Sequence, residues 1–242
     1  MSSKLITRPG FTGKIPSRGD FMTQGLPGAF VDSWHEWMQA ILAVSREQLD
    51  SRWLDTYLTS PIWHFALSAG ACGNSAMLGT MMPSVDQVGR HYPFTLAKTY
   101  NGLPVSGWLQ SNWADLQEDL ILKTLDDDIA IDQWVDALDN ANYDWPAEQK
   151  VRLTQSHKPP CHLAMVMLHE QPYSLDVLLH QSYQQQAGRY CLWWTRGSDL
   201  VPACALLSSG LPAVSQYVAM LNGDWHARGW QTVNINTTDV KP

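Results

Sequence analysis

Short apolar runs alternate with longer segments of helical periodicity along this chain, and that alternation restricts the fold more than any other feature. The runs 62–69, 76–82 and 92–100 have the length of strands, and a turn-rich stretch between the first two is typical of a hairpin. Helical spacing marks residues 27–49, with Pro27 suited to the first turn. Its apolar stripe consists of Phe30, Trp34, Trp37, Ile41 and Val44.

The same alternation continues to the end of the chain. We expect helices at 107–125, 131–140, 175–186 and 212–221, and strands at 161–168, 189–195 and 203–208. Strands buried on both sides and alternating with helices favour an α/β fold, a three-layer α/β/α sandwich around a mixed sheet. We expect one domain over residues 1–242, with the segment 156–162 as a candidate sub-domain seam.

The stretch "GFTGKIPSRGDF" at residues 10–21 concentrates glycine, proline and charge near the N-terminus. It does not match a phosphate-binding P-loop, because Gly10 and Gly13 are three residues apart and Lys14 is followed by Ile15 instead of a hydroxyl residue. The tripeptide Arg-Gly-Asp within it would matter only on an extracellular loop. The remaining interpretation is a structural turn that presents Arg18 and Asp20.

A second stretch, "MPSVDQVGRHYPF" at residues 82–94, also combines turn residues with an arginine and an aspartate. We expect the two turns to meet, with Arg18 and Arg90 pairing with Asp20 and Asp86 and the carboxylates accepting backbone N–H bonds. The alternative is an enzymatic site in which Asp20 and Asp86 form a carboxylate pair and His91 carries protons. We favour the structural interpretation, because two acids and a histidine often occur together by chance.

Charge and aromatic content indicate which partners are suitable. The net charge is −7, and the segment 115–148 holds eleven acids against a single cation, Lys123. Phosphate binding depends on cations, so this excess argues against nucleic acid and anionic membranes and suits a basic protein surface. Twelve tryptophans with only 16% charged residues favour a protein interface. The interface candidates are Asp126, Asp127, Asp128 and Trp145. We expect Trp145 to be exposed because it lies in a polar loop that a proline ends.

Neither a targeting segment nor a bound cofactor is expected. The N-terminus has no apolar h-region, and no apolar run approaches the roughly 20 residues that span a bilayer. The scattered cysteines lack metal-ligand spacing, so we expect buried thiols, no metal and no cofactor. These observations predict a cytoplasmic protein without membrane insertion.

Five ordered segments carry a family resemblance: "GKIPSRGDF", "LPGAFVDSW", "YLTSPIWHFAL", "MMPSVDQVGRHYPFTLA" and "CLWWTRGS". Together they resemble the TagF (ImpM) family of bacterial type VI secretion-associated proteins, most strongly over residues 10–97. The candidate structural or binding residues in and around these motifs are Gly13, Lys14, Pro16, Arg18, Asp20, Phe21, Trp63, Ser84, Asp86 and Arg90.

The resemblance implies a cytoplasmic, non-enzymatic accessory protein with an α/β/α fold. Such a protein negatively regulates type VI secretion after translation, by engaging the forkhead-associated scaffold protein of the system. The alternative is a small hydrolase or nucleotide-responsive protein that uses a polar site around Asp20, Asp86 and His91.

Overall fold

The computed structural model describes residues 8–148 and 175–233, which form a seven-stranded sheet with helices packed on it. The strands are β1 (Gly10–Gly13), β2 (Met22–Gln24), β3 (Trp63–Leu67), β4 (Ala76–Met82), β5 (Phe94–Tyr100), β6 (Tyr190–Thr195) and β7 (Cys204–Ser209). Their order in space is β2-β1-β5-β4-β3-β6-β7, and every neighbouring pair is antiparallel.

The prediction of a mixed α/β fold is confirmed, but the prediction of a mixed sheet is wrong. Every residue of β3 and β4 is buried, and such continuous burial is more common in parallel strands. Here the strands are connected largely by antiparallel hairpins, including the predicted one between β3 and β4. Burial on both sides therefore indicated helical cover and not strand direction.

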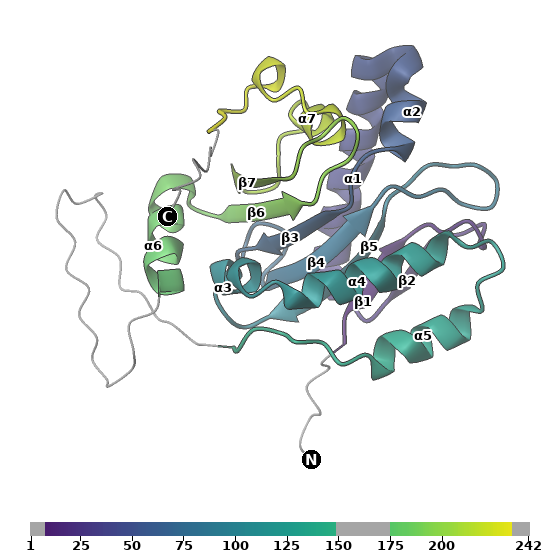
Figure 1. Ribbon diagram of the computed structural model, residues 1–242, viewed down its shortest axis with the longest axis horizontal. Helices are drawn as coiled ribbons and strands as arrows, with labels where there is room; N and C mark the ends of the chain where they lie inside the picture. Colours follow the sequence, from purple (N-terminus) through teal and green to yellow (C-terminus); the bar gives the residue numbers. More distant parts are fainter. Residues whose placement is uncertain (1–7, 149–174, 234–242) are drawn as a thin grey trace, which may run out of the picture.

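The helices are α1 (Gly28–Leu49), α2 (Trp53–Leu58), α3 (Pro104–Leu109), α4 (Asn112–Leu122), α5 (Ile131–Asn140), α6 (Leu175–Ala187) and α7 (Tyr217–Asn222). Short 3₁₀ turns occur at η1 (Asp50–Arg52), η2 (Lys123–Leu125) and η3 (His226–Arg228). Figure 1 shows α3 and α4 crossing in front of the strands. Within the described ranges, no helix is both long and apolar enough to cross a membrane.

Successive side chains of β3 enter different parts of the core. Phe65 packs in a cluster with Trp34 of α1 and Val218 of α7. Ala66, the next residue, packs in another cluster with Trp113 of α4. A third cluster joins the β5 residue Phe94 to α4 and α5. The pleat of the sheet thus separates side chains that contact α1 from those that contact α4.

Helix α1 confirms the predicted stripe, with four of its members buried and Val44 half-buried. The segment 107–125 is not one helix, because the chain breaks at Gln110 and Ser111 between α3 and α4. Serine competes for backbone hydrogen bonds and favours helix ends, and Ser111 is the residue before α4. The predicted helix at 212–221 is also shorter, and only α7 forms.

Two expected features cannot be compared with the structure. The strand predicted at 161–168 and the seam predicted at 156–162 fall outside the described residues. Of the cysteines, Cys72 and Cys191 are buried free thiols and Cys204 is half-buried.

Candidate functional site

The two charged turns lie side by side, as predicted. The first, residues 14–21, connects β1 to β2, and the second, residues 83–93, connects β4 to β5. Pairing of β1 with β5 brings these connections to the same end of the sheet. The Gln87 amide then donates a hydrogen bond of 3.0 Å to the Arg18 carbonyl. We call this pair of segments the two-turn knot.

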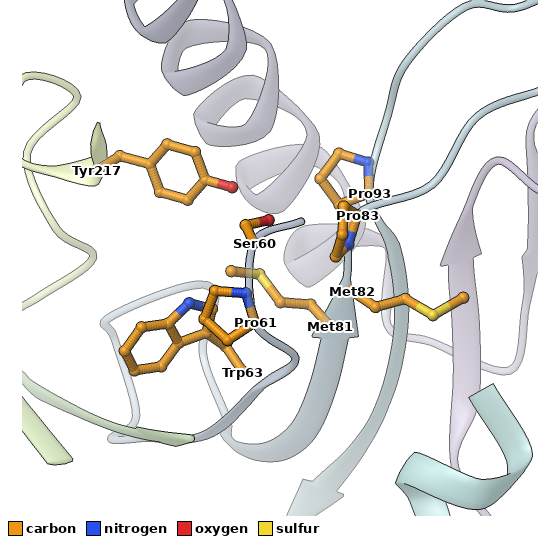
Figure 2. Close-up of a pocket in the computed structure, with 8 residues that line it drawn as sticks. All are labelled: Ser60, Pro61, Trp63, Met81, Met82, Pro83, Pro93 and Tyr217. Atoms are coloured by element: carbon orange, nitrogen blue, oxygen red, sulfur yellow. The ribbon is translucent and has the colours of Figure 1, made fainter. Parts of the chain in front are cut away.

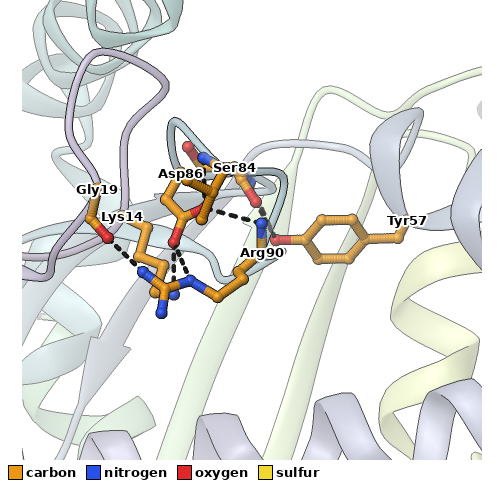
Figure 3. A network of polar contacts seen from close by, with 7 residues as sticks. Lys14, Gly19, Tyr57, Ser84, Asp86 and Arg90 are labelled. Atoms are coloured by element: carbon orange, nitrogen blue, oxygen red, sulfur yellow. Dashed lines mark hydrogen bonds and ion pairs between the residues drawn. The ribbon is translucent and has the colours of Figure 1, made fainter.

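Asp86 is the centre of the two-turn knot, and its side chain is completely buried (Figure 3). Its Oδ2 accepts hydrogen bonds from Lys14 Nζ at 2.8 Å and from Arg90 Nε at 2.6 Å. Its Oδ1 accepts from the backbone amides of Val88 at 3.1 Å and Arg90 at 2.8 Å. Arg90 also donates from its guanidinium to the Gly19 carbonyl, so it links both turns. One carboxylate therefore organises the whole knot.

These contacts determine the ionisation of Asp86. Burial alone would raise the pKa of this carboxyl, but the hydrogen bonds from Lys14 and Arg90 outweigh burial and hold the pKa well below its usual value. Lys14 is itself buried, with 6% of its surface exposed. The pair is thus a buried ion pair whose partners each need the other.

Tyr57 of α2 holds the second turn in place through Ser84. Its hydroxyl donates to the Ser84 carbonyl at 2.9 Å and accepts from the Ser84 amide at 3.0 Å, as drawn in Figure 3. Burial raises the pKa of Tyr57 well above its usual value, so the hydroxyl keeps the proton that it donates. The loop is held by α2 as well as by the first turn.

The predicted pairing pattern is only partly correct. Asp86 does pair with Arg90, but its second cation is Lys14 and not Arg18. Asp20 is exposed and has no hydrogen bond or ion pair with any described residue, so its predicted pairing is wrong. The Arg18 guanidinium is also exposed and reaches only the Ser17 carbonyl, at 3.4 Å. Neither side chain contacts the Asp86 carboxylate, so neither stabilises it directly.

Glycine and proline shape the first turn. Gly13 has φ +137°, and a Cβ there would lie 2.3 Å from the Pro93 carbonyl oxygen. Only glycine tolerates that backbone and that approach. Pro16 is the second residue of a turn closed by the Arg18 amide on the Ile15 carbonyl at 3.2 Å, a position where proline is favoured.

The outer surface of the knot combines apolar and charged groups. Phe21 is 45% exposed and packs edge-on against Tyr92. Lys14 Nζ lies 4.9 Å from the centre of the Phe21 ring. Val88, at the tip of the second turn, is exposed together with Arg18 and Arg90. Of these exposed residues, Arg90 is also bonded directly to Asp86.

The enzymatic alternative does not fit this geometry. Both oxygens of Asp86 are already occupied, and Asp20 does not join it. The His91 ring lies edge-on against Trp53 and Tyr57, at 5.3 and 5.7 Å between centroids. Burial and the nearby Arg46 lower the pKa of His91. In the described ranges, no group of three or more His, Cys, Asp or Glu could hold a metal ion.

Trp63 belongs to the interior. Its indole donates to the Met220 carbonyl at 3.1 Å and forms part of the wall of a cavity of about 10 Å³ near Met81 and Tyr217 (Figure 2). That space is enough for about one water molecule. Trp63 therefore connects β3 to α7 and is not available to a partner.

The acidic interface candidates are exposed, but the aromatic one is not. Asp126, Asp127 and Asp128 follow η2 on the surface, and the Asp128 amide donates to Asp126 Oδ1 at 3.0 Å. Trp145 is half-buried, because it stacks on Trp113 with 5.1 Å between ring centroids. The prediction that Trp145 is exposed is wrong.

The apolar groups that do accompany the acids are leucines. All twelve tryptophans lie in the described part of the chain, and none is exposed. Leu122 and Leu125 are each 43% exposed; Leu125 directly precedes the three aspartates, and Leu122 lies three residues before it. The sequence predicts one long helix over 107–125 and does not single out these two leucines as interface candidates. We call the five residues Leu122, Leu125, Asp126, Asp127 and Asp128 the acidic-leucine surface.

Comparison with known proteins identifies the family of this chain. The family model for the TagF N-terminal domain, described as type VI secretion system-associated, matches residues 10–141, more than half of the chain. The crystal structure of PA0076 from Pseudomonas aeruginosa PAO1 is similar, with 31% sequence identity and a TM-score of 0.74. The similarity covers 95% of this chain and 99% of that one. A comparison with curated proteins finds no match. The chain therefore belongs to the TagF family of type VI secretion system-associated proteins.

Proposed function

We propose that this protein restrains type VI secretion after translation, by binding the forkhead-associated scaffold protein of the system in the cytoplasm. It acts as a binding protein without catalysis or cofactor. Membership of a type VI secretion-associated family supports the choice of system. The low charge content and the exposed leucines among acids support a protein partner over nucleic acid.

We infer that the acidic-leucine surface is the contact with the scaffold, and it is the single observation that carries the proposal. Two exposed leucines beside three consecutive acids resemble the apolar centre and charged rim of an interface. The rim charges would steer encounter with a basic partner surface, and the leucines would slow dissociation. The Asp126 side chain holds its own turn, so the surface is ordered before binding.

We further infer that the chain acts as one domain with two helical layers around the sheet. The separation of the core into clusters that contain α1 and clusters that contain α4 supports this arrangement. In that arrangement, the acidic-leucine surface sits on a rigid support.

Secretion by the bacterium that makes this protein tests the proposal. Overproduction of the protein should reduce the amount of type VI substrate in the medium while transcripts and amounts of the apparatus components stay constant. Overproduction of the Leu122→Ala/Leu125→Ala variant should not reduce it. Unchanged secretion with the parent protein, or an equal reduction by the variant, would contradict the proposal. A fall in apparatus transcripts would contradict action after translation.

A further inference from the structure

A polar cleft of about 220 Å³ lies where β6 ends and β3 begins. Its walls are the connector 60–62 between α2 and β3, Glu118 of α4, and residues 195–198 after β6. A water molecule occupies about 30 Å³ of liquid, so the cleft has the volume of roughly seven water molecules, enough for a small organic molecule. The three walls come from distant parts of the sequence.

One wall holds a carboxylate that is anchored from inside the protein. Glu118 Oε2 accepts a hydrogen bond from His64 Nε2 at 3.2 Å, while His64 Nδ1 lies 2.8 Å from Thr80 Oγ1. His64 and Thr80 are buried. An ionised carboxylate can only accept, so the proton in this hydrogen bond is carried by His64 Nε2. The other Glu118 oxygen, Oε1, has no partner among the described residues.

Another part of the cleft wall holds a cation, Arg196, that can exchange its partner. Arg196 Nη2 donates to Asp115 Oδ1 at 2.6 Å, but 68% and 65% of these two side chains are exposed. An exposed pair of this kind adds little stability, so another carboxylate can replace Asp115 at small cost. Arg196 is also close enough to Glu118 to lower the pKa of that carboxyl, after the hydrogen bond from His64.

The loop that carries Arg196 is fixed in place. The Gly197 amide donates to Thr195 Oγ1 at 3.0 Å, and the Ser198 amide donates to the Val201 carbonyl at 2.7 Å. Gly197 has φ +96°, a conformation that favours glycine. Ser198 Oγ is buried and has no hydrogen-bond partner in the described part of the chain, which leaves a polar atom of the cleft wall unsatisfied.

We propose that this cleft binds a small zwitterion of the free α-amino acid type, with its ammonium on Glu118 and its carboxylate on Arg196. The cleft wall carries one acid, Glu118, and one base, Arg196, so a ligand with a single charge would pair with only one of them. Pro61 and Ile62 offer an apolar wall for the ligand side chain, which favours an aliphatic amino acid such as leucine. This role goes beyond scaffold binding, because it gives the protein a small-molecule input.

Isothermal titration calorimetry with leucine tests the assignment. Leucine should bind, whereas isopentylamine and isocaproate, which each keep one of its two charges, should bind at least about tenfold more weakly. Glu118→Gln keeps an oxygen for His64 but removes the charge, so it should weaken leucine binding by about tenfold or more. Arg196→Gln should have a similar effect.

Asp115→Asn is the matched control, because it removes the competitor for Arg196 without altering the cleft wall. Leucine affinity should stay equal or increase in this variant. A thermal melt of each variant establishes that it is folded. Absence of leucine binding to the parent protein would overturn the proposal. Equal affinity in Glu118→Gln, or binding of isopentylamine as tight as that of leucine, would also overturn it.

Discussion

Replacing Asp86 with alanine removes a completely buried carboxylate that two cations share. The Lys14 ammonium would stay buried without an acid, and breaking a buried pair in this way costs about 3–5 kcal/mol. Arg90 adds less to the loss, because 57% of its side chain is exposed and water can solvate it. A loss of 1 kcal/mol lowers the melting temperature by about 2–4 °C in a chain of this length, so the expected fall is roughly 6–20 °C.

Asp20→Ala is the matched control for this experiment, since Asp20 lies in the adjoining turn and is exposed. A surface substitution without partners changes stability by no more than about 0.5 kcal/mol. Differential scanning calorimetry of the parent and both variants gives the comparison. If Asp86→Ala melts at the same temperature as Asp20→Ala, the carboxylate does not hold the two turns together.

The stability difference between the parent protein and Asp86→Ala should depend on pH. The pKa of Asp86 is lower in the fold than its unfolded value of about 3.9, so its stabilisation is fully present above that pH. The stabilisation is lost as the pH falls below about 4 and the unfolded chain takes up a proton that the fold excludes. Urea unfolding should show a constant gap between parent and Asp86→Ala from pH 7 to about 4, and a narrowing gap below. A gap that widens towards acid would refute the sign of this linkage.

Two further substitutions test the packing on α4. Gln117 is completely buried, and neither of its side-chain amide atoms has a hydrogen-bond partner in the described ranges. Gln117→Met should therefore raise the free energy of unfolding by about 1 kcal/mol. A lower melting temperature of this variant would show that the amide is satisfied. Trp145 stacks on Trp113, and the Lys98 ammonium lies 4.7 Å from the centre of the Trp145 ring. Trp145→Ala should therefore lower the free energy of unfolding in urea by about 2 kcal/mol and leave scaffold binding intact. Unchanged stability together with weaker binding would show that Trp145 is an interface residue.

Local periodicity predicted the helices and strands that are long and apolar enough to show a clear pattern within their own residues. Helix α1 and the strands β3, β4 and β5 are long and apolar enough for this. The short strands β1 and β2 were missed, because they contain four and three residues and depend on pairing with each other and with β5. Strand direction could not be predicted either. Burial of both faces of a strand indicates that helices cover the sheet, but it does not indicate which strands are neighbours.

The candidate site divides in the same way. The pairing of Asp86 with Arg90 could be predicted, because the two residues are four positions apart in a turn. Lys14 is 72 positions from Asp86, and only the pairing of β1 with β5 brings it there. Trp145 was predicted to be exposed from its polar loop, but its stacking partner Trp113 belongs to α4. Contacts that depend on the register of distant elements cannot be read from a local motif.

The rates of binding to the purified forkhead-associated scaffold test the central claim most directly. Biolayer interferometry should show a complex with the parent protein. Leu122→Ala/Leu125→Ala should speed dissociation by about tenfold, because buried apolar anchors carry most of the affinity. Replacing Asp126, Asp127 and Asp128 with asparagine should slow association by on the order of tenfold at low salt and flatten its salt dependence. Absence of binding by the parent protein would contradict the account, and unchanged rates in both variants would move the contact away from the acidic-leucine surface.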